Sequence, residues 1–73
     1  MAFPAEFVNF GKIDFSNCYV YLYSSPHNRK PLPNVPANIV NAWWQGSNVA
    51  VETSTGWVYM YNGFTSYASK YQK

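Results

Sequence analysis

The sequence predicts a small, mainly β domain: an antiparallel five-stranded sheet or small half-barrel with a short C-terminal helix. Two observations predict this fold class. Strand-favouring Val, Ile, Tyr, Phe, Trp and Thr cluster in short runs, and helical periodicity is weak. Gly, Asn and Ser stand between the runs, where tight turns need them. The length of 73 residues predicts one domain over 1–73.

The first two predicted strands form a hairpin over residues 6–23. Gly11 suits a bend or bulge within the first run, 6–15, whose inward face is ambiguous. The second run, 18–23, has an aliphatic face with Cys18, Val20 and Leu22 and an aromatic face with Tyr19, Tyr21 and Tyr23. We therefore expect Cys18 to be a small core residue.

Residues 24–38 are predicted to form a long Pro-rich loop. Its prolines lack the N–H that a strand ladder needs, and they are Pro26, Pro31, Pro33 and Pro36. The spacing Pro33-x-x-Pro36 beside Arg29 and Lys30 suits docking in an aromatic groove. Pro-rich loops are also common connectors, and a crossover between two hairpins is the simpler interpretation.

The most regular part of the chain follows this loop. Three strands are predicted at 39–45, 49–53 and 57–61, with turns at 46–48 and 54–56. Two tight connections between three short strands make a β-meander. Thr65 or Ser66 then suits the N-cap of a short helix ending at Lys70, whose charge complements the helix dipole.

One segment resembles a known family. The stretches Val49-Ala-Val-Glu-Thr, Gly56-Trp-Val-Tyr-Met-Tyr and Gly63-Phe followed by Tyr67 resemble the KTSC domain, and the resemblance covers residues 39–71. The charged final segment of that family is absent here. The resemblance implies strands followed by a short helix and implies little about activity.

Composition limits the chemistry of the chain. Cys18 is the only cysteine, so no disulfide forms within the chain. His27 is the only histidine and there are three carboxylates, which argues against a metal site or another cofactor. The net charge of +2 permits an anionic partner but does not demand one.

Nothing in the sequence predicts a membrane protein or a secreted one. No run approaches the ~20 apolar residues of a membrane span, and residues 1–10 do not resemble a secretion signal. A single cysteine fits a reducing compartment. We expect the protein to be cytoplasmic, or virion-associated if it belongs to a phage.

No catalytic residues are predicted. His27 stands in the Pro-rich loop beside Arg29 and Lys30, where a solvated loop histidine is the simpler interpretation. Cys18 could act as a nucleophile only if His27 reached it. The sequence contains neither a Gly-rich phosphate loop nor a nucleophile elbow. We therefore expect a protein that is not an enzyme.

The aromatic residues are the most informative feature, at 21% of the chain against 11% charged. The runs 18–23 and 57–61 each have one aliphatic and one aromatic face, so both faces of the sheet are suited to burial. Three interpretations remain open: a barrel interior, a contact with a protein or a second copy, and stacking of nucleic-acid bases. Trp43 and Trp44 must point to opposite faces of a regular strand, which makes one of them a candidate contact residue.

We expect a small interaction or assembly module, such as an accessory or structural protein of a phage or mobile element, acting as a homo-oligomer or on another protein. The alternative is a single-stranded nucleic-acid binder. The candidate partner-binding residues are Trp43, Trp44, Tyr19, Tyr21, Tyr23, Trp57 and Tyr59. The candidate contacts for an anion or nucleic acid are Arg29 and Lys30.

Overall fold

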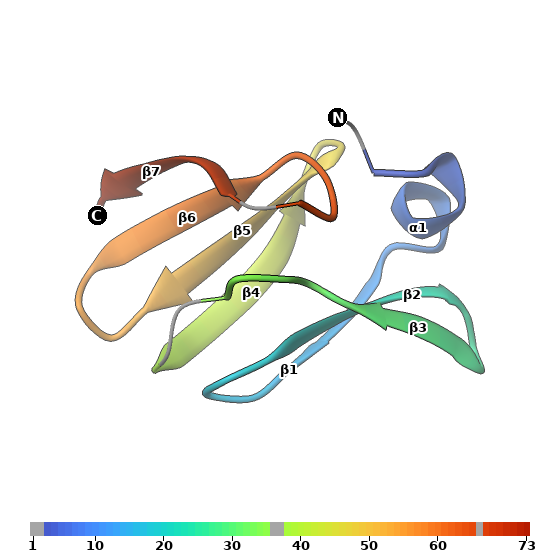
Figure 1. Cartoon of the computed structure of the whole chain (residues 1–73), viewed down its shortest axis with the longest axis horizontal. Helices are drawn as coiled ribbons and strands as arrows, with labels where there is room; N and C mark the ends of the chain where they lie inside the picture. The colour runs from blue at the N-terminus through green and yellow to red at the C-terminus, as the bar shows by residue number, and fades with distance from the viewer. Residues whose placement is uncertain (1–2, 36–37, 66) are drawn as a thin grey trace.

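A computed structural model describes residues 3–35, 38–65 and 67–73 of the chain. It contains two antiparallel sheets, with strand orders β1-β2-β3 and β4-β5-β6-β7 (Figure 1). The elements are α1 (Ala5–Phe10), β1 (Lys12–Phe15), β2 (Val20–Ser25), β3 (Asn28–Pro31), β4 (Ile39–Gln45), β5 (Asn48–Thr53), β6 (Trp57–Tyr61) and β7 (Tyr67–Gln72). None of the helices in the described ranges has the length and apolarity needed to cross a membrane.

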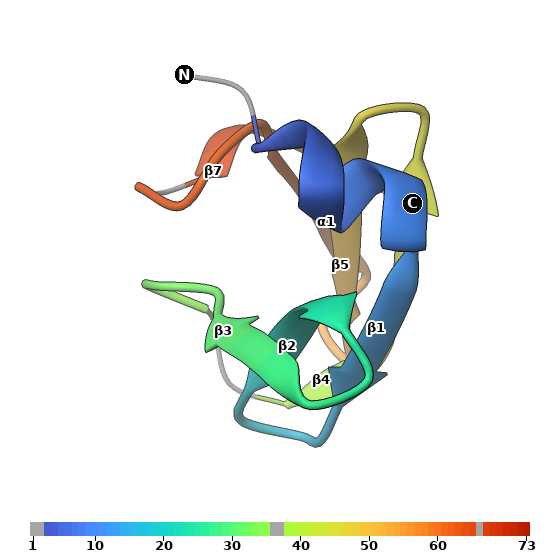
Figure 2. The ribbon, with the colours of Figure 1, turned by 90° about the vertical axis from the view of Figure 1, so that its right-hand side faces the viewer.

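The core lies between the two sheets, which curve around one interior with α1 at one end (Figure 2). Val20 and Leu22 of β2 are fully buried, as are Val49, Val51 and Tyr61 of the four-stranded sheet. Phe3 and Phe7 complete this cluster from the N-terminal segment. Burying each of these large side chains stabilises the fold by about 1.5–3 kcal/mol.

The predicted meander is confirmed. β4, β5 and β6 pair in sequence order, with Trp43 opposite Ala50 and Ala50 opposite Met60. The two connections place Gly46 and Gly56 at φ 65° and φ 89°, where glycine alone avoids a steric penalty. Turn chemistry and alternation therefore agree with the fold along the whole of 39–61.

The predicted strand over 6–15 is wrong for its first half, which is the helix α1. Pro4 precedes the helix at φ −56°, a value that proline favours at helix starts, and Glu6 lies in the first turn. Gly11 ends the helix at φ 70° and donates its N–H to the Phe7 carbonyl. The hairpin with β2 therefore begins only at Lys12.

The predicted loop over 24–38 is wrong in part, because it contains the strand β3. β3 pairs with β2 and is an edge strand among the described residues, and an edge is where a sheet tolerates proline such as Pro31. All four residues of β3 are exposed. Pro36, the second proline of the expected docking motif, lies outside the described residues.

The predicted C-terminal helix is also wrong, as is the helix that the family resemblance implied. Residues Tyr67–Gln72 form β7, which pairs with β6 and brings the number of described strands to seven. A helix of about six residues is marginal on its own, whereas pairing satisfies the backbone groups along β6. Thr65 precedes β7, and Ser66, the other expected cap, lies outside the described residues.

Candidate functional site

The predicted site residues do not form one surface. Paired residues in a sheet share a face and successive rows alternate between faces, so the strand register assigns each residue to a side. The outer side of β1-β2-β3 carries Tyr21, Tyr23 and Arg29, and Tyr19, directly before β2, packs beside the Tyr21 ring. The outer side of β4–β7 carries Trp43, and the inner side of that sheet carries Trp44, Trp57 and Tyr59.

The first group is the tyrosine–cation face, defined here by Lys12, Tyr19, Tyr21, Tyr23 and Arg29. Tyr23 pairs with Lys12 on one side and Arg29 on the other, which forms one continuous row across the three strands. The intervening row contains Leu22, which is fully buried in the core, so the tyrosines point away from it. Tyr19 and Tyr21 lie 5.0 Å apart between ring centroids.

The two cations of this face lie directly on its rings. The Lys12 Nζ is 4.6 Å from the Tyr23 ring centroid, and the Arg29 Cζ is 4.2 Å from that of Tyr21. An Arg29 N–H also donates to the Tyr23 hydroxyl over 3.4 Å. That hydrogen bond is the main cause that raises the pKa of Arg29, and an arginine side chain is always charged in proteins. Tyr23 is only 9% exposed, whereas Tyr19 is 40% exposed.

Sequence reasoning missed Lys12 as a member of this face. The expected strand over 6–15 left the inward side ambiguous, so no register could be assigned to its residues. The hairpin of 12–15 with 20–23 places Lys12 opposite Tyr23. Recognising Pro4 and Gly11 as the two ends of a helix would have predicted this shorter hairpin from the sequence.

The second group is the Trp43 face, defined here by Trp43, Ala50, Val58, Met60 and Tyr71. Trp43, Ala50 and Met60 form one row across β4, β5 and β6. In the next row on the same side of the sheet, Val58 pairs with Tyr71. Ala50 and Val58 are almost completely buried, although neither belongs to the core cluster. Their larger neighbours on this outer side therefore cover them.

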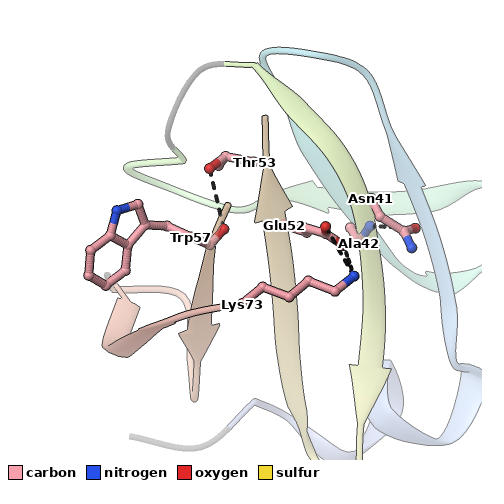
Figure 3. Close-up of polar contacts among 6 residues, drawn as sticks. All are labelled: Asn41, Ala42, Glu52, Thr53, Trp57 and Lys73. Carbon is pink, nitrogen blue, oxygen red and sulfur yellow. Dashed lines mark hydrogen bonds and ion pairs between the residues drawn. The ribbon is translucent and has the colours of Figure 1, made fainter. Parts of the chain in front are cut away.

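The Trp43 face also contains one ion pair, because Glu52 lies beside Val58 in the same row. The Lys73 Nζ reaches across the sheet to the Glu52 carboxylate over 3.2 Å, as Figure 3 shows. Asn41 lies on the other side of Glu52, where its side-chain oxygen accepts the Ala42 N–H. The two charges neutralise each other, so the face as a whole carries no net charge.

The third group consists of Trp44, Trp57 and Tyr59 on the inner side of the four-stranded sheet, and part of it packs against the core. Trp44 packs edge-on against Phe3 at 5.4 Å, and its buried Nε1 has no hydrogen-bond partner among the described residues. Lys70 lies over the rings of Trp57 and Tyr59, at 5.0 and 5.9 Å from their centroids. Trp43 lies on the outer side of this sheet and Trp44 on the inner side, so the two point to opposite faces, as predicted.

Lys30 does not join Arg29 on the tyrosine–cation face. Its register partner is the core residue Leu22, so it points to the opposite side of β3 from Arg29. There its Nζ lies 4.7 Å from the Phe64 ring centroid. The two candidate anion contacts, Arg29 and Lys30, therefore lie on opposite faces, because neighbours along a strand face opposite ways.

The residues considered for catalysis are both exposed. Cys18 was expected in the core, but it lies in a bend before β2 begins at Val20, outside the alternation of that strand. His27 lies in the turn between β2 and β3. In the described part of the chain, no three metal-ligating side chains gather into a cluster.

No family model, curated protein or solved structure matches the chain, so the resemblance of residues 39–71 to the KTSC domain stays a prediction, neither supported nor refuted.

Proposed function

We propose that this protein is a non-enzymatic assembly module whose Trp43 face binds a second copy of the chain. The observation that carries the proposal is the uncharged row Trp43–Ala50–Met60, which lies on the side of the sheet opposite the core. Tyr71, 46% exposed at the edge of the same face, extends this apolar surface across β7.

The chemistry of the face is that of an interface centre. Such centres are enriched in aromatic residues and Met and depleted of charge, and Trp is the residue most often found at their energetic centre. The face contains one charged pair, Glu52 and Lys73, which neutralise each other. Two copies can therefore bring the same face together without opposing like charges, as an isologous contact requires.

The size of the face predicts weak assembly. Four strands spaced about 4.8 Å apart, with about five residues each at 3.3 Å, cover roughly 300 Å² in projection. Stable interfaces bury about 800 Å² on each partner. The Trp43 face alone is smaller than that, so we expect dissociation in the high-micromolar range rather than an obligate dimer.

Sedimentation or light scattering over a concentration series tests the proposal. Wild type should pass from monomer to dimer as concentration rises, and Trp43→Ser and Met60→Lys should remain monomeric with unchanged circular dichroism. Tyr19→Ser, which removes an exposed aromatic ring from the other sheet, is the matched control and should assemble like wild type. A reducing agent keeps the exposed Cys18 from cross-linking the chains.

The result that would contradict self-assembly is a wild-type monomer at about 1 mM, the concentration at which even a very weak pair with a binding free energy near −4 kcal/mol is half formed. Equal loss of assembly in Tyr19→Ser and Trp43→Ser would also contradict it, because the contact would then not be confined to the Trp43 face.

We also propose that the protein works in a reducing setting, either the cytoplasm or a virion assembled there. Its role there would be that of an accessory or structural protein of a phage or mobile element. Support comes from the size, the low charge and the exposed, unpaired Cys18, which an oxidising compartment would tend to modify. Thiol labelling of protein taken directly from its native source checks the compartment. A fully oxidised Cys18 would contradict it.

A further inference from the structure

The tyrosine–cation face lies on the other sheet from the Trp43 face and takes no part in the proposed assembly. Its arrangement is specific: Tyr21 and Tyr23 on β2 and Tyr19 directly before it, with Lys12 on the strand before and Arg29 on the strand after. The sequence alone suggested five dispersed cations. The fold brings two of them onto the tyrosine rings, which removes the main objection to a phosphate-binding surface.

We infer that the tyrosine–cation face is a weak binding site for single-stranded nucleic acid, in which Tyr19 and the Arg29–Tyr21 pair stack bases and Lys12 and Arg29 contact phosphates. Open aromatic rings on a sheet, combined with cations along the backbone path, are what sequence-tolerant single-strand binding needs.

Each residue has a distinct part in this site. Tyr19 offers the most exposed ring of the three. The Tyr21 ring is occupied by Arg29 at 4.2 Å, so the exposed guanidinium becomes the outer surface on which a base stacks. Tyr23 is buried, and its hydroxyl accepts a hydrogen bond that positions Arg29. Tyr23 is thus a positioning residue rather than a stacking one.

The charge of the face sets the strength of binding. Asp14 lies opposite Tyr21 on the same side and offsets one of the two cations. Two phosphate contacts predict a slope of log K against log salt of about −1.4 for a single strand. With one or two stacked bases, we expect dissociation constants of roughly 10 µM to 1 mM at low salt.

The test uses the full chain with oligothymidylate and oligouridylate of about 12 nucleotides, labelled for fluorescence anisotropy, at about 20 and 150 mM NaCl. Wild type should bind both probes, and a marked preference for one identifies DNA or RNA as the source of the strand. Tyr19→Ala should weaken binding about 5- to 150-fold with the salt slope unchanged, while Tyr19→Phe should keep wild-type affinity.

Charge variants distinguish a local binding site on this face from attraction by the net charge of the protein. Arg29→Ala should weaken binding and reduce the salt slope by about 0.7, and Arg29→Lys should restore the slope but not the full affinity, since lysine lacks the planar group. Lys73→Ala removes the same charge on the other sheet and should have little effect. Trp43→Ser should bind like wild type, which separates this inference from the proposed assembly.

Three results would overturn the inference. The first is no binding of either probe at millimolar protein. The second is equal weakening by Arg29→Ala and Lys73→Ala, which would mean attraction by net charge alone. The third is a polyglutamate peptide that competes as well as the oligonucleotides, which would make the face a general anion or acidic-protein contact that does not stack bases.

Discussion

Tyr61 is the residue whose replacement tests the packing between the two sheets most sharply. Its side chain is fully buried, and its hydroxyl donates a hydrogen bond to the Asn34 carbonyl over 3.0 Å. Tyr61→Phe keeps the buried ring and removes only this bond. Because Asn34 is exposed, its carbonyl can bond to water instead, and the loss is the net value of a hydrogen bond, about 0.5–1.5 kcal/mol, which for a domain of this size lowers Tm by roughly 2–12 °C.

The same hydroxyl predicts a pH dependence of that difference. Burial is the main cause that raises the pKa of Tyr61 from 10.0 to about 12, with contributions from Tyr67 and Tyr59. The folded chain therefore holds the proton more tightly than the unfolded chain, and the contribution to stability is complete below pH 10. Each pH unit between the two pKa values removes about 1.4 kcal/mol more from wild type than from Tyr61→Phe, which lacks this hydroxyl.

Urea unfolding of both proteins at neutral pH and at about pH 11 measures this effect. The gap between wild type and Tyr61→Phe should be about 0.5–1.5 kcal/mol at neutral pH, the net value of a hydrogen bond, and should close or reverse at the higher pH. Tyr19→Phe, at an exposed position, is the control and should match wild type at both. A gap that is absent at neutral pH, or that stays constant with pH, would refute the reasoning.

Two further substitutions test the core and its border. Leu22→Ala should lower the free energy of unfolding by about 2–5 kcal/mol in chemical denaturation, because Leu22 is fully buried between the sheets. Val40→Ala, at an exposed position, should stay within about 0.5 kcal/mol of wild type. Equal effects would contradict the described core. The buried Thr53 hydroxyl bonds with the Thr55 hydroxyl at 2.7 Å and donates to the Trp57 carbonyl at 3.3 Å. Thr53→Val should therefore lower the free energy of unfolding by about 1–2 kcal/mol. A neutral effect in thermal unfolding would show that neither bond matters.

The sequence predicted the parts of the fold that side-chain burial determines. β4, β5 and β6 alternate apolar residues and end in turn formers, so they could be found without the structure. β3 and β7 are exposed along their whole length, and backbone pairing rather than side-chain burial holds them. Such edge strands leave no periodic pattern to detect, and β7 was therefore mistaken for a helix.

The candidate site was predictable in its residue types but not in its grouping. Alternation correctly separated Trp43 from Trp44 and the tyrosines of β2 from Val20 and Leu22. Which of the two faces is outside depends on where the other sheet packs, a tertiary fact that no local pattern contains. The same holds for Arg29, whose contacts with two tyrosines follow from the register of β3, a strand that was not expected.

The most direct test of the central claim follows the three tryptophan indole N–H signals by NMR as the protein is diluted. Trp43 lies on the proposed contact face, whereas Trp44 and Trp57 lie on the inner side of the same sheet. Because a contact changes the environment of the rings it covers, the Trp43 signal should shift with concentration while those of Trp44 and Trp57 stay fixed. A Trp43 signal that does not move up to about 1 mM, or that moves no more than the other two, would contradict assembly through this face.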